Sequence, residues 1–371
     1  MELIEFYPLK GYLNEPQNRD RIDASIKRVL EEDILINGKQ VMDFQRNFSK
    51  YVGTKYCIGT GNGHDSLTLA LRGLSVSNGD EVIVPAFTFI ATWFCVETVS
   101  ATPVPCDVGE NGQLDLEKCK IMITSRTRAV IFVHLYGIAT DLTEFAKYLK
   151  DRNIFLIEDC AQATGARINE RHVGTFGDIG CFSFYPTKNL GALGDGGAIV
   201  TDNEKVALTI DSIRNFGVKE SKYNHEIIGV NSRLDTIQAA WLTSQLDFLD
   251  QENSKRKFLA KEMHNALLES SYVTTLNRLY DESSSDVFHL FVVLCKRERN
   301  KVIEKLEDLG IGYDCHYPRA IVEQKVYSSR NFKLELFPNS IKLAQTVVSL
   351  PLYPWITEQV KDELVSRLRF L

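Results

Sequence analysis

The sequence has few of the features that mark membrane, metal-binding or secreted proteins. No run without a charged residue is longer than 15 residues, and one that reaches this length, residues 82–96, contains Pro85, so it is too short and too interrupted to span a membrane. The N-terminal segment lacks the apolar core of a secretory signal peptide. The seven histidines do not show the spacing of metal ligands, and we expect no metal site.

Closely spaced cysteine pairs and an excess of positive charge are also absent. The net charge of −6 gives no basic field over the whole chain, so we expect neither nucleic acid nor a membrane as a partner. The cysteines include no C-x-x-C pair, and most lie in apolar, strand-like runs. Such residues are typical of reduced thiols in the core of a cytoplasmic protein. The eight cysteines are Cys57, Cys95, Cys106, Cys119, Cys160, Cys181, Cys295 and Cys315.

Length and composition are those of an ordinary globular protein. The chain has 371 residues, of which 44% are apolar and 25% charged, which predicts a large core and about two domains. Strand and helix patterns alternate through roughly the first 160 residues. The expected strands are residues 56–60, 81–85, 104–107, 129–135 and 154–159, and the expected helices are residues 17–32, 38–51, 64–74, 88–99 and 142–151. This alternation predicts an α/β fold with a mostly parallel sheet flanked by helices, whose ligands bind beyond the carboxyl ends of the strands.

A helical, highly charged pattern replaces the alternation between residues 232 and 270. We interpret it as a long connecting helix with a break near Asn253. A smaller α/β unit follows, with a strand at residues 288–294 and a helix at residues 300–309 that ends at Gly310. We therefore expect a large domain over residues 1–250 and a small C-terminal domain over residues 251–371.

The stretch FGDIGCFSFYPTKNLGALGDGGAIV, residues 176–200, sets one lysine, Lys188, between two strand patterns. Residues 181–185 are aromatic and apolar, Pro186 ends that strand, and residues 196–200 form the next one. The glycines between them let the backbone approach a planar or anionic group closely. A lysine in such a crowded, half-buried place can lose its proton and act as a nucleophile, although the pattern also fits a surface lysine in a glycine-rich turn.

The strand ends near this lysine carry groups that suit pyridoxal 5′-phosphate. Asp159, at the end of FLIED, can pair with the ring nitrogen and keep it protonated, which makes the ring an electron sink. Gln162 can donate a hydrogen bond to the ring hydroxyl, and Phe89 can stack on the ring. Each residue has a plainer alternative: Asp159 as the cap of the next turn, Gln162 in a loop hydrogen bond, and Phe89 as a core aromatic.

The phosphate of this cofactor needs hydrogen-bond donors, and the positive end of a helix dipole stabilises its negative charge. The turn GNGH precedes an expected helix, so the backbone N–H groups of Gly63 and His64 are candidates. Ser183 offers a hydroxyl, and the alternation of a strand places Ser183 and Tyr185 on one face. The turn lacks the G-x-G-x-x-G pattern of a dinucleotide site.

With these motifs the chain resembles the DegT/DnrJ/EryC1/StrS family of pyridoxal-phosphate-dependent aminotransferases. Members of that family act on nucleotide-linked keto sugars and have the type I fold of the aspartate aminotransferase superfamily. The resemblance covers nearly the whole chain, and FSFYPTKNLGALGDGG is its most specific motif. The other matching motifs are GDEVIVPAFTFIAT, VHLYG, IEDCAQATGA, RNFG, GVNSRLDTIQAAWL, HYP and SLPLYP.

The resemblance implies a role for each candidate residue. Lys188 forms the Schiff base and carries protons. Asn231 of GVNSR reaches the phosphate of the neighbouring subunit's cofactor, which implies a homodimer with shared active sites. His316 and Tyr317 lie near the sugar, and we expect Tyr185 to contact it as well. The residues expected to hold the cofactor within one chain are Gly63, His64, Phe89, Asp159, Gln162, Ser183 and Lys188.

The predicted activity is the transfer of an amino group from L-glutamate to a nucleotide-linked keto-6-deoxyhexose, with dTDP as the expected nucleotide and C3 as the expected carbon. The product is expected to be a deoxyamino sugar for a surface polysaccharide or glycan, such as the O-antigen of lipopolysaccharide. The turn Asn62-Gly63-His64 stands where Ser-Gly-Thr is common and is similar to relatives that aminate C3. The run YPRAIVEQ departs from the family, because Ala320 and Val322 replace a proline and a histidine, and any sugar contact from that histidine is lost.

Other functions stay open at this point. The same reaction at C4 of a nucleotide-linked 4-keto sugar is one, and a non-catalytic regulator that kept the fold is another, although every position that the chemistry requires is filled. Relatives that deoxygenate sugars replace the lysine with histidine, which Lys188 argues against. The string FSFYPTKNL disfavours a carbon–carbon bond-forming enzyme of the same superfamily.

Overall fold

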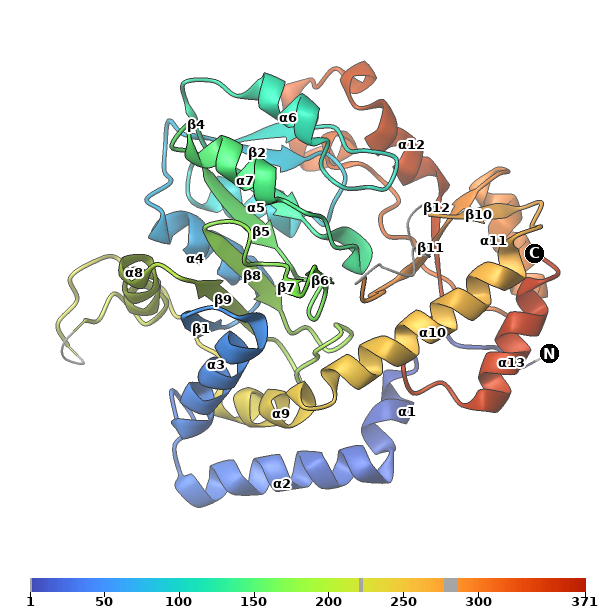
Figure 1. Cartoon of the computed structure of the whole chain (residues 1–371), viewed down its shortest axis with the longest axis horizontal. Helices are drawn as coiled ribbons and strands as arrows, with labels where there is room; N and C mark the ends of the chain where they lie inside the picture. The colour runs from blue at the N-terminus through green and yellow to red at the C-terminus, as the bar shows by residue number, and fades with distance from the viewer. Residues whose placement is uncertain (1, 220–222, 277–285) are drawn as a thin grey trace.

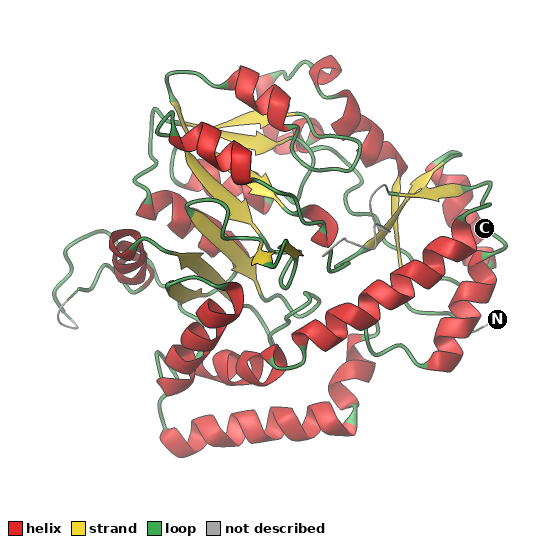
Figure 2. Ribbon diagram, in the orientation of Figure 1, coloured by secondary structure: helices red, strands yellow, loops and turns green. Residues whose placement is uncertain are grey.

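The protein consists of a large sheet between helices and a small sheet close to both termini (Figure 1). The computed structural model describes residues 2–219, 223–276 and 286–371. A long helix, α10 (Leu249–Leu267), leads from the large sheet to the small one, as the ribbon in Figure 2 also shows. In the described ranges, no helix is long and apolar enough to cross a membrane.

The large sheet has seven strands in the order β1-β9-β8-β5-β4-β2-β3. The five strands from β8 to β3 are parallel to one another, whereas β9 is antiparallel to both of its neighbours, β8 and β1. The predicted α/β class with a mostly parallel sheet is therefore confirmed. The strands are β1 (Tyr56–Thr60), β2 (Glu81–Pro85), β3 (Thr102–Cys106), β4 (Thr127–Val133), β5 (Phe155–Asp159), β8 (Ile179–Ser183) and β9 (Gly197–Thr201).

Two hydrophobic clusters cover the two faces of this sheet, because successive residues of a strand point to opposite sides. In β8, Cys181 belongs to one cluster and Phe182 to the other. Burial of each large apolar side chain contributes about 1.5–3 kcal/mol, so the sheet is held from both sides. The first cluster includes side chains of α4 (Gly63–Gly73), α5 (Ala91–Thr98) and α8 (Glu204–Arg214). The second includes side chains of α3 (Lys39–Val52), α6 (Leu116–Met122), α7 (Thr143–Lys150) and α9 (Thr236–Leu246).

The small sheet is antiparallel, with β11 between β10 and β12. Ile4 forms a bridge with Ile311, so the first described residues lie beside the C-terminal part. The predicted division at residue 250 falls at the start of α10, and the extents of the two domains stay a prediction. The strands are β10 (Val273–Thr275), β11 (Phe291–Cys295) and β12 (Val347–Leu350), and the helices are α11 (Arg299–Asp308), η2 (Ile321–Glu323), η3 (Lys325–Arg330), η4 (Leu334–Leu336), α12 (Pro338–Thr346) and α13 (Glu358–Leu368).

The remaining elements are short or lie at the periphery. Helices α1 and α2 come before α3, and the two-stranded β6–β7 hairpin follows β5. Their bounds are α1 (Leu9–Asn14), α2 (Pro16–Glu32), η1 (Leu135–Gly137), β6 (Arg167–Ile168) and β7 (Arg171–His172).

Several predicted elements differ from the structure in their bounds. The helix expected from residue 88 begins only at Ala91, and β8 ends at Ser183 rather than at residue 185. The break expected near Asn253 is wrong. The chain breaks between Leu246 and Leu249, and Asn253 lies inside α10, where its side-chain amide donates to the Thr164 carbonyl at 3.1 Å. A polar residue suggested a helix end, but burial against a loop carbonyl gives this asparagine a place in the helix.

Candidate active site

The candidate residues gather at one edge of the large sheet. β2, β4, β5 and β8 are parallel and end at this edge, and β1 ends there too because two antiparallel pairings separate it from β8. Phe89 follows β2, Asp159 ends β5 and Ser183 ends β8. Gly63 begins α4 after β1, and Lys188 comes five residues after β8. The fold therefore brings together groups that are far apart in the sequence, as expected for this sheet type.

Lys188 is half-buried in the glycine-rich stretch after β8. Its backbone N–H donates to the Tyr185 carbonyl at 2.8 Å, and its Nζ lies 3.4 Å from His289 Nε2. Burial of the amine lowers the pKa of Lys188 to about 8, although the negative charge of Asp159 opposes this shift. A lysine whose pKa lies so near neutrality exchanges a proton readily and has a sizeable fraction of nucleophilic amine.

Asp159 is 6% exposed, and each of its oxygens accepts one hydrogen bond. Oδ1 accepts from the Ala161 N–H at 3.1 Å, as the turn-cap alternative requires, and Oδ2 accepts from Thr92 Oγ1 at 3.2 Å. Burial raises the pKa of Asp159, while these hydrogen bonds and the charge of Lys188 oppose the shift. A carboxylate at this depth needs a cation beside it, and a protonated ring nitrogen fits that need.

Gln162 is buried, and both ends of its side chain are engaged. Its Oε1 accepts from the Tyr136 N–H at 2.7 Å, which is the loop hydrogen bond of the plainer alternative. Its Nε2 donates to Tyr317 Oη at 3.0 Å, so Gln162 joins the loop after β4 to the residue expected near the sugar. Tyr136 also donates through its hydroxyl to the His316 carbonyl. The sequence pointed to Gln162 but not to Tyr136, although the motif VHLYG spans the end of β4 at the same edge.

The N-terminus of α4 and Ser183 form a cradle that suits an anion. Asn62 caps the helix by accepting from the Asp65 N–H at 2.8 Å, and the N–H groups at the start of a helix have no intrahelical acceptor. A Cβ on Gly63 would lie 2.6 Å from Ser183 Cβ, so only glycine allows this approach. His64 is the next residue of the helix and is half-buried. The donor set fits the phosphate of the expected cofactor.

Aromatic side chains line the open side of this region. Phe89 is 54% exposed, which does not fit a core aromatic, and its ring centroid lies 5.7 Å from that of Tyr317. Tyr185 is 53% exposed and lies beyond the end of β8, so the expected strand alternation with Ser183 does not apply to it. His316 adjoins Tyr317 and forms a hydrogen bond of 2.9 Å between its Nδ1 and Ser349 Oγ. The pKa of His316 is lowered by burial.

Asn231 is exposed and forms an isolated bridge with Asn215. The next residue, Ser232, is tied to the turn before α4, because its hydroxyl accepts from the Gly61 N–H at 3.0 Å and donates to Asp65 Oδ2 at 2.7 Å. The chain therefore carries Asn231 close to its own α4, with the asparagine itself at the surface. Its contact with a neighbouring subunit's cofactor stays a prediction.

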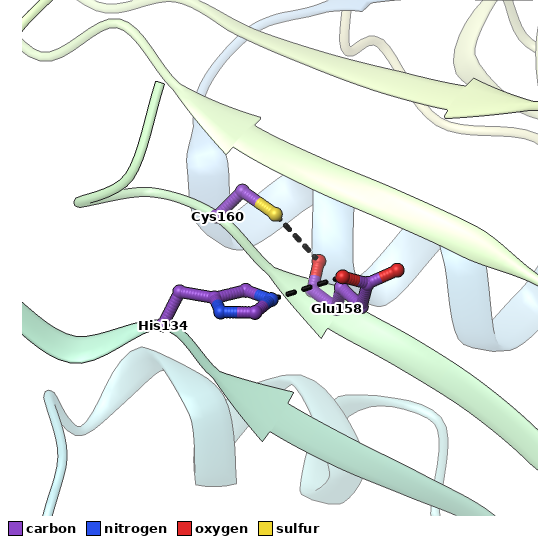
Figure 3. A group of neighbouring side chains, drawn as sticks. All are labelled: His134, Glu158 and Cys160. Carbon is purple, nitrogen blue, oxygen red and sulfur yellow. Dashed lines mark hydrogen bonds and ion pairs between the residues drawn. The ribbon is translucent and has the colours of Figure 1, made fainter. Parts of the chain in front are cut away.

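A buried polar cluster lies beside Asp159 and consists of His134, Glu158 and Cys160 (Figure 3). One ligand atom from each residue lies within 4.8 Å of the others. His134 Nε2 is 2.9 Å from Glu158 Oε2, and the N–H groups of Gly174 and Gly177 each donate to Glu158 at 2.7 Å. Burial raises the pKa of the Cys160 thiol, so it stays protonated. The two bonds from Gly174 and Gly177 connect the turn before β8 to β5.

His289, like Tyr136, is a residue of this site that the sequence did not reveal. It was placed inside an expected strand from residue 288, but β11 begins only at Phe291. Its imidazole is buried and faces the amine of Lys188. Only the three-dimensional contact identifies it, because a histidine in an apolar run is usually a core residue.

Comparison with known proteins decides between the families that use such a site. A model of the DegT/DnrJ/EryC1/StrS aminotransferase family matches residues 16–369.

The chain belongs to the DegT/DnrJ/EryC1/StrS aminotransferase family.

Two characterised relatives and one solved structure show how far the similarity extends. The dTDP-3-amino-3,6-dideoxy-alpha-D-galactopyranose transaminase of Aneurinibacillus thermoaerophilus is 41% identical, with 93% of each chain covered. The dTDP-3-amino-3,4,6-trideoxy-alpha-D-glucose transaminase of Streptomyces venezuelae is 38% identical, with 99% of this chain and 95% of the relative covered. The crystal structure of S. venezuelae DesV in complex with a ketimine intermediate superposes with a TM-score of 0.94 at 36% identity, covering 100% of this chain and 98% of the other.

Membership of the family confirms several predictions. The protein is a sugar aminotransferase, and its fold is that of the type I pyridoxal-phosphate enzymes. Aminotransferases of this family use pyridoxal 5′-phosphate, so the predicted cofactor is also confirmed. The residues that hold it in this chain stay predictions, which the buried carboxylate of Asp159 and the cradle at Gly63 support.

Proposed function

We propose that this protein transfers the amino group of L-glutamate to C3 of a dTDP-linked keto-6-deoxyhexose. The observation that carries the proposal is the meeting of Lys188, Asp159 and the α4 cradle at one sheet edge in a member of this family. The amine, the carboxylate and the anion site are the groups that a pyridoxal-phosphate aminotransferase requires.

The residues of this chain would divide the work as follows. Ser183 and the first N–H groups of α4 hold the phosphate, and Asp159 holds a positive charge at the ring nitrogen. Pyridoxal phosphate, when bound, supplies an electron sink for the carbon that loses its proton. Lys188 takes up and returns that proton, for which a pKa of about 8 is well suited. Tyr317, held by Gln162, closes the site toward the sugar.

Two observations support C3 as the carbon that receives the amino group. The turn Asn62-Gly63-His64, which caps α4, is similar to that of relatives that aminate C3. The two relatives compared above are both named as 3-amino-sugar transaminases acting on dTDP sugars. The position where many members carry a sugar-binding histidine is Val322 here, which is buried with Ala320, so the sugar must be held differently on that side.

The proposal includes a homodimer in which each chain completes the other's site. Asn231 is exposed and follows a segment with exposed apolar side chains, among them Ile228 at 87% and Val230 at 39%. Apolar groups beside an exposed polar anchor are expected at an interface. The dimer would bury them and bring the Asn231 amide to the partner's phosphate.

The product would be a deoxyamino sugar for a surface polysaccharide or glycan, such as the O-antigen of lipopolysaccharide. We place the reaction in the cytoplasm, because all eight cysteines are free thiols, as a reducing compartment permits.

The test has two stages. Glutamate alone should release one equivalent of 2-oxoglutarate per site from the wild-type enzyme and none from a Lys188→Ala control. A dTDP-3-keto-6-deoxyhexose and its 4-keto isomer are then offered separately to the aminated enzyme. Consumption of the 3-keto sugar supports the proposal, and consumption of only the 4-keto isomer would move the reaction to C4. No release of 2-oxoglutarate by the wild type would favour a regulator.

A further inference from the structure

The amine of Lys188 has a neighbour to which the chemistry above assigns no part. His289 Nε2 lies 3.4 Å from Lys188 Nζ, and 101 residues separate the two in the chain. His289 is 6% exposed, so the contact lies inside the protein. A histidine at this place can act on the lysine itself, which is the group that must be free in part of each reaction cycle.

The backbone around His289 is fixed to the edge of the large sheet. The His289 N–H donates to the Tyr136 carbonyl at 3.0 Å, and the Val287 N–H donates to the Gly137 carbonyl at 3.0 Å. Gly137 has a φ of +90°, and a Cβ there would lie 2.8 Å from the backbone nitrogen of His289. The loop after β4, which also contacts Gln162, therefore sets the position of the imidazole.

The surroundings of His289 determine whether the imidazole is charged and which of its two nitrogens carries the hydrogen. Burial, followed by Coulomb interactions with Lys188, Arg256 and His316, holds the pKa of His289 well below its usual value, so the ring is neutral. Its Nδ1 has no hydrogen-bond partner in the part of the chain that the structure describes. If Nε2 accepts from the lysine, the ring hydrogen sits on Nδ1, and the imidazole can hold the ammonium group without removing its proton.

We propose that His289 is a positioning residue for Lys188. Its Nε2 accepts a hydrogen bond from the lysine amine whenever that amine is not bonded to the cofactor. The hydrogen bond holds the amine inside the site and keeps its proton on the lysine rather than on the imidazole. The negative charge of Asp159 likewise favours the protonated form of the lysine. This inference rests on the proposed function of Lys188, but its test does not require sugar turnover.

The contact predicts a specific effect on the lysine. A hydrogen bond accepted from a charged amine stabilises the charged form, so it raises the pKa of Lys188 against the effect of burial. Loss of the acceptor should lower that pKa by about one pH unit, the scale of one hydrogen bond to a charged group. A His289 that only filled space would leave the pKa unchanged when replaced by another buried side chain.

The experiment uses full-length protein freed of cofactor. Pyridoxal 5′-phosphate is added over a range of pH on both sides of the lysine's pKa, the bond is fixed with borohydride, and the labelled fraction of the peptide with Lys188 is measured. The midpoint pH should fall by about one unit in His289→Leu and stay near the wild-type value in His289→Gln, whose amide oxygen can accept the hydrogen bond. His172→Leu, which removes another buried imidazole, serves as the control and should not move the midpoint.

The outcomes are separable. A wild-type midpoint in His289→Leu, or an equal shift in His289→Leu and His289→Gln, would overturn the positioning role. Absence of label at Lys188 in the wild type would instead contradict the proposed function.

If His289→Leu does not fold, nitrogen NMR of ¹⁵N-histidine-labelled wild-type protein decides the question. The inference requires hydrogen on Nδ1 and an acceptor signal from Nε2 that changes when cofactor binds. Hydrogen on Nε2 in the cofactor-free protein would overturn it.

Discussion

Asp159 combines a structural and a chemical task in one carboxyl group. One oxygen caps the turn by accepting from the Ala161 N–H, and the other accepts from Thr92. The turn needs only an acceptor, which an amide also provides, whereas the ring nitrogen needs a negative charge. The two tasks can therefore be separated by a substitution that keeps the shape and removes the charge.

We expect Asp159→Asn to fold normally and to lose at least about a hundredfold in the rate of the glutamate half-reaction. The amide oxygen can still accept from Ala161, but the charge pair with the ring nitrogen is lost, at a cost on the order of 3 kcal/mol. Stopped-flow measurement of the cofactor's absorbance with glutamate gives the rate, and the thermal midpoint reports folding. A rate near that of the wild type would mean that Asp159 is only a turn cap.

Gly63 sets the width of the anion cradle. A methyl group there would lie 2.6 Å from Ser183 Cβ, which is closer than real contacts allow, so Gly63→Ala must push Ser183 and the start of α4 apart. We expect the affinity for pyridoxal phosphate to fall tenfold or more, about 1.4 kcal/mol, in an absorbance titration of cofactor-free protein. Gly11→Ala is the control, since a Cβ on Gly11 has no atom within 4 Å, and the two variants should differ clearly.

At the level of secondary-structure elements, the β6–β7 hairpin depends on one neutral histidine. His172 Nε2 accepts from the Gly165 N–H at 2.9 Å, and its Nδ1 donates to the Val173 carbonyl. Burial lowers the pKa of His172 to about 4 from an ordinary value of 6.5. The folded hairpin therefore keeps the imidazole uncharged where the unfolded chain would protonate it.

This difference predicts an acid-sensitive hairpin. Below pH 6.5 the unfolded state binds the proton and the folded state does not until about pH 4, so the free energy of unfolding falls over that range. The full effect of His172 is roughly 3 kcal/mol. In urea-unfolding experiments, the free energy of unfolding should decrease less between pH 6.5 and pH 4 in His172→Gln than in the wild type. Above pH 6.5 the free energy of unfolding should depend on pH in the same way in both proteins. If it also falls equally steeply in both proteins between pH 6.5 and pH 4, His172 is not the group responsible.

At the scale of the whole molecule, the proposed shared site makes assembly testable. Asn231 at the partner's phosphate would supply a hydrogen bond worth about 1.5–3 kcal/mol to a charged group. Asn231→Asp would set a like charge against the phosphate, so both it and Lys188→Ala should be nearly inactive as homodimers. A mixed dimer of the two would contain one site with an intact lysine and an intact asparagine.

We therefore expect mixing of Lys188→Ala and Asn231→Asp chains to restore activity toward half of the wild-type value per dimer. Subunit exchange is confirmed with differently tagged chains, and each variant mixed with itself serves as the control. If exchange takes place and no activity returns, each Asn231 serves its own chain and the shared site is excluded.

Local sequence features were enough to identify the family and the class of the sheet, and they also pointed to the residues that we propose for the chemistry. Strand periodicity, the glycine pattern and the acid at the end of FLIED are local features, so Lys188, Asp159 and the α4 cradle could be found without coordinates. The remaining features became visible only in the three-dimensional structure. It placed the helix break at residues 247–248, buried Val322 and set His289 against Lys188 across 101 residues. Such contacts depend on how separate elements pack, and no local pattern carries that information.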